Sequence, residues 1–434
     1  MHQSRVKVDY LTRVEGEGGI EILLDEERKV REIKVHIFEP PRFFEGILKG
    51  RRCEEVPDIV ARICGICPVS YQMAALKALE RILGIKPGRQ VRLLRKVFAL
   101  SQWIQSHSLH VFCLALPDFL GYDDIFQMAG KHRDLVERGL RLKKLGNDIT
   151  SMLGGREVHP VSAVLGGFTK LPPRSLREDL ITQLEARQED AHAALEFIAG
   201  LALPAWEGER VFGALSHPEE YAIDEGRWRT STGLSLAPEE FPDYVEEFQV
   251  SYSNALRCRL KDGPYYMVGP LARVRLNFEQ LAPEAQRAAL RLNLNFFHHN
   301  PYHSIVARLL EIVHAIEACC EYLEEAPEKE ETISYEVKGG EAASIVEAPR
   351  GSLFHWYQLN ERGFVQKARI IAPTTQNLHR IEQDLRELVP AIAGEPDGEI
   401  ARSCAVAVRN YDPCISCATH FLTKIFHSVF SRPH

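Results

Sequence analysis

The pattern of apolar and polar positions divides the chain into regions of different predicted secondary structure. Over residues 5–38 the two kinds of residue alternate in RVKVDYL, GGIEILL and VREIKVHIF, with a charged turn before the last segment. Because successive side chains of a strand point to opposite faces, this alternation predicts antiparallel strands. From about 56 to 152, and again over 174–202, apolar residues recur at helical spacing, which predicts a series of long helices.

The second half of the chain changes its pattern several times. The signal is weak between about 205 and 275, where turns separate short strand-like pieces such as PYYMVG. Helical spacing returns over 283–326, strands are predicted over 333–371, and two helices are predicted near 376–393 and 397–409. The predicted fold class is therefore α+β, with a mainly helical core bundle and small antiparallel β-sheets.

Composition narrows the classes of protein that fit this pattern. The chain has 434 residues, a formal net charge of −7 and 45% hydrophobic residues, which is ample for a large core. A mildly acidic chain without a basic block does not favour a nucleic-acid partner. The N-terminus MHQSRVKVDY lacks the apolar region of a secretory signal, and no apolar run reaches the roughly 18–20 residues needed to span a bilayer. These features predict a soluble, intracellular protein.

Two Cys-X-X-Cys pairs are the clearest chemical signal among the ten cysteines. Cys64 and Cys67 lie in RICGIC, and Cys414 and Cys417 lie in DPCISC near the other end of the chain. In a reducing compartment such pairs are more often metal ligands or redox centres than disulfides. Four thiolates can hold structural zinc, an iron–sulfur cluster, or nickel with iron, and the spacing alone leaves these alternatives open beside two unrelated pairs. A helical bundle can bring the two ends together.

The sequence motifs around the two cysteine pairs resemble those of a known protein family. RICGIC and DPCISCATH, together with LTRVEGEGGIEI, PRFFEGILKGR, VLGGFTKLP, EAPRGSL and IIAPTTQN, resemble the large, catalytic subunit of nickel–iron hydrogenases, in the same order over residues 9–420. The segments RVEGEGG, PRFFEGIL and ALPDFLGY are most similar to the cytoplasmic, multi-subunit, NAD(P)-linked branch, which includes bidirectional and sulfhydrogenase-like enzymes. The resemblance implies reversible heterolytic cleavage of H2 to protons and electrons.

The resemblance also implies a division of the chain. It gives one large-subunit domain over residues 1–420 and a C-terminal extension over residues 421–434 that a maturation protease removes after nickel insertion, with a nickel chaperone as a further partner. The parts of that domain are expected to be an N-terminal β region, a helical core, an irregular α/β insertion, and helices with a β hairpin and the second metal motif, over residues 1–50, 51–205, 206–280 and 281–420. The extension carries an apolar stripe at helical spacing, for which a permanent tail helix packed on a partner is the rival interpretation: Phe421, Leu422, Ile425, Phe426, Val429 and Phe430.

In the family, each cysteine pair gives one terminal and one bridging thiolate. By resemblance, Cys64 and Cys414 bind nickel alone, whereas Cys67 and Cys417 bridge nickel and iron. The iron carries carbonyl and cyanide ligands in the family. Soft thiolates suit these metals.

Four further residues are expected around the iron ligands by resemblance. Arg350, after Pro349 in APRG, matches an arginine beside the metals, where a fixed cation suits a cyanide nitrogen. Thr374 matches a hydroxyl that donates to a cyanide, and Asp412 is expected to pair with the Arg350 region. Read alone, the arginine would suit a surface ion pair, and the threonine and aspartate would suit turns.

Proton transfer needs a base beside the metals. By resemblance, the thiolate of Cys414 accepts the proton first and Glu15, in RVEGEGG, relays it outward. Glu17 is the rival candidate, but it lies off the position that matches the motif. Flanking glycines favour close backbone packing around Glu15 rather than a solvated carboxylate.

A magnesium site is also implied by resemblance. Glu45, the backbone carbonyl near Ile370, and His420 match a site that fixes the C-terminus in the family. Oxygen donors with waters suit magnesium, whereas a histidine ligand is less typical.

The sequence departs from the family at two positions near these motifs. Tyr71 stands where the family usually has a histidine, four residues after the second cysteine of the first pair. Tyrosine can donate one hydrogen bond but does not shuttle protons near neutral pH. Ser106, before His107, stands where many relatives have an aspartate.

The chain has no spare motif for an iron–sulfur cluster. The resemblance therefore implies a separate small subunit that carries iron–sulfur clusters, and further flavin and iron–sulfur subunits that reduce NAD(P) or a similar acceptor. The alternative classes are a structural zinc protein and a relative of the quinone-binding subunit of respiratory complex I. The complex I relative lacks the four metal cysteines, which this chain has.

Overall fold

The computed structural model describes residues 4–206, 208–296, 298–327 and 333–420. Its main helices are α3, α4, α7, α8, α12, α13 and α14, at Pro68–Leu83, Arg89–Ser108, Arg133–Gly154, Arg174–Ala199, Ser304–Glu325, Pro373–Ile392 and Asp397–Asn410. The shorter helices are α1, α2, α5, α6, α9, α10 and α11, at Phe44–Leu48, Val56–Val60, Leu116–Leu120, Ile125–Ala129, Phe241–Tyr244, Pro270–Leu276 and Pro283–Arg291.

The strands form small sheets rather than one large sheet. The N-terminal sheet contains β1, β2 and β3, and a second antiparallel sheet contains β12, β13 and β14, at Ser4–Val8, Gly18–Leu24, Val30–Ile37, Gly340–Ala348, Gly351–Leu359 and Val365–Ile371. Between them in the sequence lie short strands β4 to β11, at Ala163–Val164, Gly167–Phe168, Val211–Ser216, Arg227–Thr230, Ser235–Leu236, Val245–Gln249, Leu256–Leu260 and Tyr266–Met267. Among these, β11 pairs with β6 in parallel, whereas the other pairings of the described strands are antiparallel.

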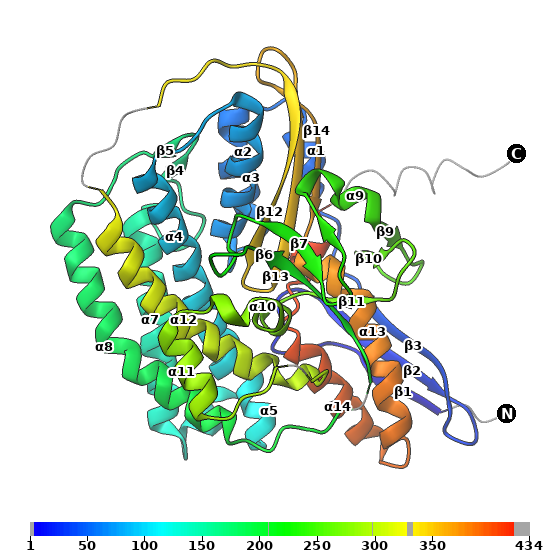
Figure 1. Ribbon diagram of the computed structural model, residues 1–434. Helices are drawn as coiled ribbons and strands as arrows, with labels where there is room; N and C mark the ends of the chain where they lie inside the picture. The colour runs from blue at the N-terminus through cyan, green and yellow to red at the C-terminus, as the bar shows by residue number, and fades with distance from the viewer. Residues whose placement is uncertain (1–3, 207, 297, 328–332, 421–434) are drawn as a thin grey trace, which may run out of the picture.

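A layer of four long helices forms one side of the molecule. Helices α4, α7, α8 and α12 lie side by side, as Figure 1 shows on its left. Their apolar faces supply much of the largest core cluster, which includes Phe98 and Trp103 on α4 and Leu309 on α12. Close approach of α7 to α4 depends on Gly146, where a Cβ would lie 2.6 Å from the carbonyl oxygen of Ser101.

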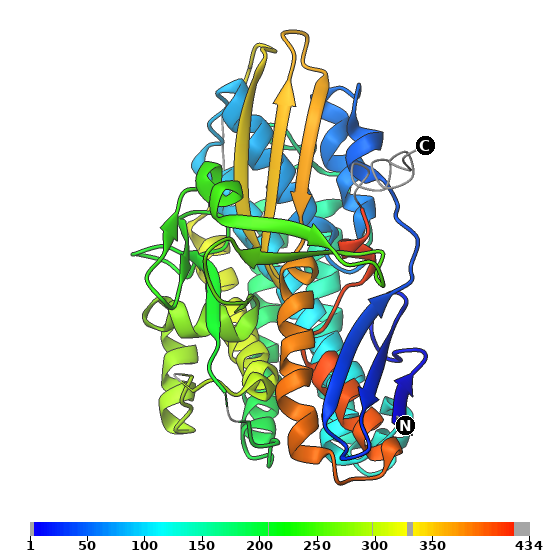
Figure 2. The same cartoon turned by 90° about the vertical axis from the view of Figure 1, so that its right-hand side faces the viewer.

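Helix α3 connects this layer to the sheet of β12, β13 and β14. It packs against β12 and β13, and these elements together form a second core cluster that contains all four cysteines of the two pairs. The first pair lies at the start of α3 and the second follows α14. In Figure 2 the red stretch after α14 lies between the N-terminal sheet and helices α1 and α2.

The structure confirms the predicted α+β class, and it differs from the predicted elements in three places. The region predicted as helical over 283–326 contains two helices, α11 and α12, because Asn293 has φ = +51° and Pro301 begins a separate turn of 3₁₀ helix. The first strand of the later sheet starts at Gly340 rather than near residue 333. Helix α4 is followed directly by a π-helical segment, Leu109–Ala115, where an α-helix was predicted. The predicted apolar stripe over 421–434 lies outside the described residues.

Within the described parts of the chain, no helix has both the length and the apolar character needed to cross a bilayer.

Candidate metal centre

The four cysteines of the two pairs meet at one buried point. Their sulfur atoms all lie within 4.8 Å of one another. The Sγ atoms of Cys64 and Cys414 are 3.4 Å apart, and those of Cys67 and Cys417 are 3.9 Å apart. The Sγ atoms of Cys414 and Cys417 are neighbours as well, and all four cysteines can bind metal as thiolates.

The start of α3 positions the first pair and favours a thiolate at Cys64. Cys67 is the N-cap residue of α3, and the backbone N–H groups of Ile66 and Cys67 donate to Cys64 Sγ at 3.3 and 3.2 Å. Burial raises the pKa of the Cys64 thiol, but hydrogen bonding from Cys67 and the positive charge of Arg350 together hold that pKa below its usual value. The pKa of Cys67 is raised well above its usual value, first by the hydrogen bond with Cys64 and then by burial.

The second pair sits on a tight turn that follows α14. The turn includes Asp412 in the left-handed region, with φ = +57°. The backbone N–H of Cys414 donates to Thr374 Oγ1 at 2.9 Å, which places this predicted hydroxyl beside the sulfur cluster. A short 3₁₀ helix, Ser416–Ala418, then carries Cys417.

Glu15 joins the N-terminal sheet region to this turn. Its Oε2 atom accepts hydrogen bonds from Cys414 Sγ at 3.0 Å and from the backbone N–H of Ser416 at 3.1 Å. The backbone carbonyl of Glu15 also accepts from the N–H of Ile415 at 2.9 Å. Close backbone packing here depends on Gly16, which has φ = +90° and where a Cβ would lie 2.7 Å from Ile415 Cβ. Glu17, the rival in the sequence, is exposed.

Arg350 lies in the turn between β12 and β13 and points to the same site. Its Nη2 atom is 2.9 Å from Asp412 Oδ1, and its Nε atom donates to the Asp412 carbonyl at 2.8 Å. Burial raises the pKa of Asp412, but the charges of Arg350, His110 and Arg308, with the hydrogen bond from Arg350, together hold that pKa below its usual range. The third guanidinium nitrogen, Nη1, is buried without a hydrogen-bond partner. The neighbouring Pro349 carbonyl accepts from Arg273 Nη2 at 3.1 Å.

Glu45, Ile370 and His420 also lie together. Glu45 Oε1 accepts from the backbone N–H of Ile370 at 2.8 Å, and His420 Nε2 lies 2.6 Å from the Ile370 carbonyl oxygen. Burial raises the pKa of Glu45 to about 8. The three groups are neighbours at the point where the described chain ends.

A buried charge network behind Arg350 was not predicted from the sequence. Arg308 Nη1 is 3.6 Å from Asp412 Oδ2 and 3.4 Å from His107 Nδ1. Glu311, completely buried, accepts from His107 at 2.8 Å and pairs with Arg273 at 2.7 Å. The sequence signal that could have found it is SIVARLLEIVHAI, in which an arginine and a glutamate interrupt an otherwise apolar helix and lie three residues apart.

The two departures from the family pattern are both buried. Tyr71 packs against His355, with ring centroids 5.6 Å apart, and its Oη atom has no hydrogen-bond partner. Ser106 is 1% exposed, and its Oγ atom likewise has no partner.

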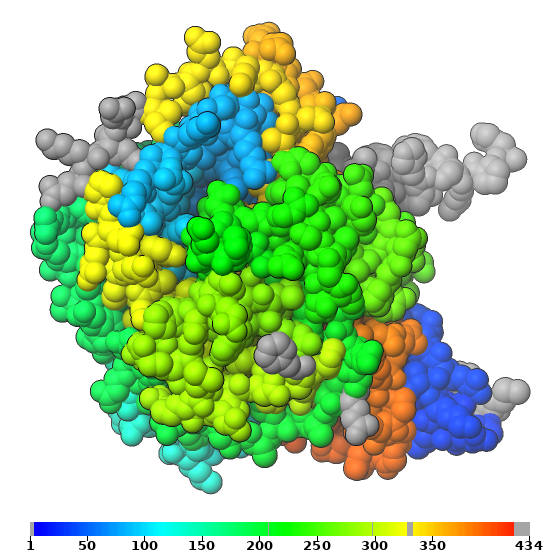
Figure 3. Space-filling model, in the orientation of Figure 1, coloured from blue at the N-terminus to red at the C-terminus, as the bar shows by residue number. Residues whose placement is uncertain are grey.

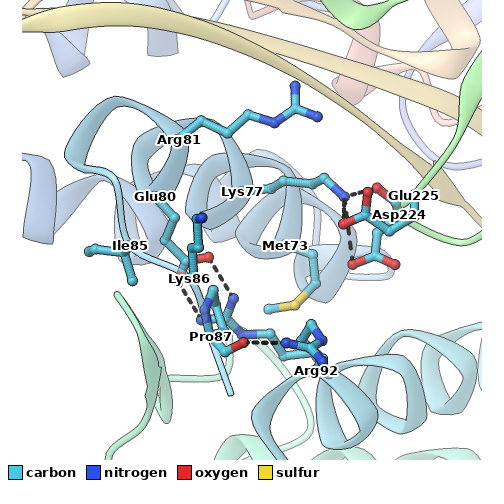
Figure 4. A pocket seen from close by; sticks show the side chains of 11 residues that line it. Met73, Lys77, Glu80, Arg81, Ile85, Lys86, Pro87, Arg92, Asp224 and Glu225 are labelled. Atoms are coloured by element: carbon cyan, nitrogen blue, oxygen red, sulfur yellow. Dashed lines mark hydrogen bonds and ion pairs between the residues drawn. The ribbon is translucent and has the colours of Figure 1, made fainter. Parts of the chain in front are cut away.

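A separate cavity of about 320 Å³ lies at the other end of α3. Figure 4 shows its charged lining, in which Lys77 pairs with Glu225 and Arg92 donates to the Pro87 carbonyl. In Figure 3 it is a hollow between the blue residues of α3 and α4 and the green segment near residue 225. It contains none of the four cysteines and is therefore not the candidate metal centre.

The residues at the cysteine cluster fit a nickel–iron centre. Four sulfur donors suit soft metals and can give both terminal and bridging ligands. The unpartnered Nη1 of Arg350 can donate to an anionic group bound beside the sulfur atoms. Donor chemistry alone also allows zinc.

Comparison with known proteins distinguishes a nickel–iron centre from a zinc site. Residues 42–138 and 237–420 match the family model described as nickel-dependent hydrogenase, and residues 5–39 match a model described as HoxL-like. The chain is 34% identical over 424 residues to sulfhydrogenase 1 subunit alpha of Pyrococcus furiosus, covering 96% of this chain and 97% of that protein. It is 28% identical over 476 residues to the NAD-reducing hydrogenase HoxS subunit beta of Cupriavidus necator, covering 97% and 96% of the two chains.

The solved structures agree with the sequence matches. A crystal structure of an NAD+-reducing [NiFe]-hydrogenase in the H2-reduced state superposes with a TM-score of 0.88 at 29% identity, covering 96% of this chain and 99% of that chain. A [NiFeSe]-hydrogenase of Dm. baculatum has a TM-score of 0.80 at 23% identity, covering 96% and 100% of the two chains, and so supports the fold. The resemblance found in the motifs is thus confirmed, and the chain belongs to the nickel-dependent hydrogenase family as a large, catalytic subunit with a nickel–iron centre.

Proposed function

We propose that this chain catalyses H2 ⇌ 2 H⁺ + 2 e⁻ at a nickel–iron centre held by Cys64, Cys67, Cys414 and Cys417. The observation that carries this proposal is the convergence of two cysteine pairs, 350 residues apart in sequence, within one buried cluster. The bound centre would supply the site for heterolytic cleavage of H2 and the acceptor of its electrons. Cys64 and Cys414 would each bind nickel alone, and Cys67 and Cys417 would hold nickel and iron together.

Cys414 and Glu15 carry the first proton transfer away from the centre. Cys414 Sγ lies 3.0 Å from Glu15 Oε2, which is within direct hydrogen-bond reach for general acid–base transfer. The sulfur accepts the proton and passes it to the carboxylate. The backbone N–H of Ser416, at 3.1 Å from the same oxygen, fixes the orientation of the carboxylate.

Arg350 and its neighbours would orient the carbonyl and cyanide ligands of a bound iron. The buried Nη1 of Arg350 has a free donor, and Asp412 holds the guanidinium from its other side. Thr374 and Pro349 complete this wall of the site. A fixed cation in a dry pocket stabilises anionic ligands strongly because little water screens it.

Glu45, Ile370 and His420 form a magnesium site. A carboxylate and a backbone carbonyl are oxygen donors of the kind that magnesium takes, and the imidazole adds a nitrogen donor. Their proximity at the end of the described chain supports a role in fixing the second cysteine pair in place.

The enzyme works as a cytoplasmic assembly of several subunits. A small subunit with iron–sulfur clusters receives the electrons, and flavin and iron–sulfur subunits pass them to NAD(P). The names of two relatives, an alpha subunit of a sulfhydrogenase and a beta subunit of an NAD-reducing hydrogenase, support this arrangement. A nickel chaperone and a maturation protease acting on residues 421–434 serve its assembly.

Metal analysis of the purified complex tests the proposed function. We expect nickel in an amount equal to that of this chain and iron in excess of nickel, because the iron–sulfur clusters of the other subunits add to the iron of the centre, together with H2-dependent reduction of an electron-accepting dye. Cys64→Ser and Cys417→Ser each remove a thiolate ligand and should abolish both nickel binding and activity. Cys404→Ser, at a buried cysteine outside the cluster, is the matched control and should keep both. Zinc without nickel in the wild-type complex would contradict the proposal and support a structural zinc site.

A further inference from the structure

The segment that links β3 to α1 lies beside the second cysteine pair. It runs over residues 38–43, and Figure 2 shows it in blue next to the red stretch that carries this pair. The backbone N–H of Arg42 donates to the Thr419 carbonyl at 2.6 Å, which ties the segment to the chain just after Cys417. The backbone alone thus places Arg42 close to the candidate metal centre.

The Arg42 side chain contacts the backbone beside each of the two pairs. Its Nη2 atom donates to the Ile63 carbonyl at 2.6 Å and also to the Ser416 carbonyl. Ile63 directly precedes Cys64, and Ser416 directly precedes Cys417. Because Nη2 carries two hydrogens, it can donate to both carbonyls at once. One nitrogen atom therefore joins two segments that come from opposite ends of the chain.

Neighbouring contacts fix the direction of the Arg42 guanidinium. Its Cζ atom lies 5.4 Å from the centre of the Phe44 ring, and its Nε atom lies 3.9 Å from Glu39 Oε1. Phe43, directly after Arg42, has φ = +54°, in the left-handed region that bulky residues rarely adopt. Strained backbone of this kind persists where the surrounding contacts determine it, and it is concentrated at functional sites. Backbone and side-chain contacts together thus direct Arg42 to the two cysteine pairs.

Other polar side chains near the centre each hold one pair. Gln105 donates to the Ile66 carbonyl inside the first pair at 2.7 Å, whereas Thr374 accepts from the N–H of Cys414 in the second. Neither contact relates the position of one pair to that of the other. A site with four sulfur ligands depends on that relation, because groups that orient metal ligands affect metal affinity strongly.

We propose that Arg42 is a positioning residue that fixes the two cysteine pairs relative to each other, through hydrogen bonds from Nη2 to the carbonyls of Ile63 and Ser416. The inference rests on the proposed function in one respect, because it takes the four cysteines as a single metal site. Arg42 acts on the backbone that carries the ligands and contacts no metal itself. Because both hydrogen bonds join protein groups, this role can be tested without nickel.

Arg42→Met tests the inference on the reduced, full-length chain prepared without nickel. Methionine keeps much of the length and the apolar stem of arginine but has no donor. Cadmium is the probe, because a soft divalent ion favours thiolate ligands. We expect the wild-type chain to bind one cadmium ion through the four clustered sulfur atoms, counted by X-ray absorption. Arg42→Met should bind cadmium about 10–100-fold more weakly and with fewer sulfur ligands.

The matched control is Arg28→Met, which removes another arginine that joins two segments through backbone carbonyls. Arg28 Nε and Nη2 donate to the carbonyls of Ala393 and Glu395 at 2.5 and 3.1 Å, away from the cysteines. Its side chain is 36% exposed, close to the 30% of Arg42. We expect both variants to unfold at lower urea concentration than the wild type, but Arg28→Met should bind cadmium as the wild type does.

Two results would overturn the inference while the proposed function stood. One is an unchanged cadmium affinity and sulfur count in Arg42→Met. The other is equal weakening of cadmium binding in Arg42→Met and Arg28→Met, since a general loss of stability would then explain the effect. Absence of nickel from the wild-type complex would instead overturn the proposed function.

Arg42→Lys takes the place of Arg42→Met if the methionine variant does not fold. An ammonium keeps the positive charge, but it reaches less far and lacks the planar fork of donors. Arg42→Lys should therefore also bind cadmium more weakly than the wild type, and unchanged binding would overturn the inference.

Discussion

Glu15 contacts the second cysteine pair through both its side chain and its backbone. The carboxylate accepts from Cys414 Sγ and from the Ser416 N–H, whereas the backbone carbonyl accepts from the Ile415 N–H. Removing the charge while keeping the shape of the side chain separates proton transfer from architecture, because an amide still accepts hydrogen bonds through its oxygen.

Glu15→Gln should therefore slow catalysis without releasing the metals. We expect H2/D2O exchange to fall by about 10²–10⁴-fold, which is the usual contribution of a positioned acid or base. Mass spectrometry of the gas phase measures the exchange, and elemental analysis measures nickel. Glu17→Gln, at the exposed neighbouring carboxylate, is the control and should exchange normally. Loss of nickel from Glu15→Gln would contradict a relay role.

Some site residues could be predicted from the sequence alone, whereas others could not. The four cysteines, Glu15 and Arg350 belong to short local motifs, and the structure brings them together. Arg308 and Glu311 carry no such motif, because their partners Asp412 and His107 lie about 100 and 200 residues away and only the tertiary fold joins them. The environment of Tyr71 depends in the same way on His355 from a distant strand.

The position of helix α7 depends on its close packing against helix α4. Gly146 lies where α7 crosses α4, and a Cβ there would lie 2.6 Å from both the Ser101 carbonyl oxygen and the Gln105 backbone nitrogen. Helix propensity favours alanine over glycine by about 1 kcal/mol. At Gly146, however, the added Cβ would meet backbone atoms of α4, which cannot move aside as a flexible side chain can.

A Gly→Ala substitution should thus change the free energy of unfolding in opposite directions in helices α7 and α14. Gly146→Ala is expected to destabilise the protein by about 1–3 kcal/mol through overpacking. Gly398→Ala, in the exposed first turn of α14 with no atom within 4 Å of the added Cβ, is expected to stabilise it by up to about 1 kcal/mol. Urea unfolding of both variants measures the difference, and equal effects would contradict the close contact between α7 and α4.

Buried histidines give the helical layer a pH dependence. Burial lowers the pKa of His314 on α12 to about 4, and the imidazole accepts from the Ala282 N–H through Nδ1 at 2.9 Å. In the unfolded chain the pKa returns to about 6.5. Between these values the unfolded state binds more protons than the folded state, so stability is complete above about pH 6.5 and falls as the pH drops toward 4.

His314→Gln should flatten this dependence. The histidine contributes up to about 3 kcal/mol to the fall in unfolding free energy between pH 7 and pH 4, at 1.36 kcal/mol per unit of pKa difference. Urea unfolding at several pH values measures the slope. His217→Gln, at a half-exposed position, is the control and should keep the wild-type slope. A slope unchanged by His314→Gln would contradict a neutral, buried imidazole.

Elements with a long uninterrupted pattern were predictable from the sequence. The three N-terminal strands, α8 and the two helices before the second cysteine pair follow their expected periods. The π-helical segment Leu109–Ala115 was not predictable, because its apolar residues fit an α-helix equally well. Its extra residue per turn places His110 against the Arg409 carbonyl at 2.8 Å, a contact that only the packed molecule defines.

On the scale of the whole molecule, Asp118 joins the two ends of the chain outside the cysteine cluster. Its carboxylate, 5% exposed, pairs with Arg13 near the N-terminus and with Arg409 on α14. These arginines lie two residues before Glu15 and five before Cys414. The pairing thus holds both segments that form the candidate proton path.

Asp118→Asn should weaken the whole fold. It leaves two largely buried guanidinium groups without their counter-charge, which costs about 3–5 kcal/mol for a buried pair. Urea unfolding should show that loss, and nickel retention during dialysis against a chelator should fall with it. Asp148→Asn, in an exposed pair with Lys144, is the control and should cost about 1 kcal/mol or less. Equal losses in the two variants would contradict the bridging role.

The cysteine ligands at positions 64, 67, 414 and 417 are also synthesised at very different times during translation. Ribosomes add about 5–20 residues per second, so roughly 18–70 s pass between translation of the first pair and of the second, 350 residues later. During that interval the early thiols have no partners. The centre can therefore be completed only once almost the whole polypeptide has been made, which reserves nickel for full-length chains.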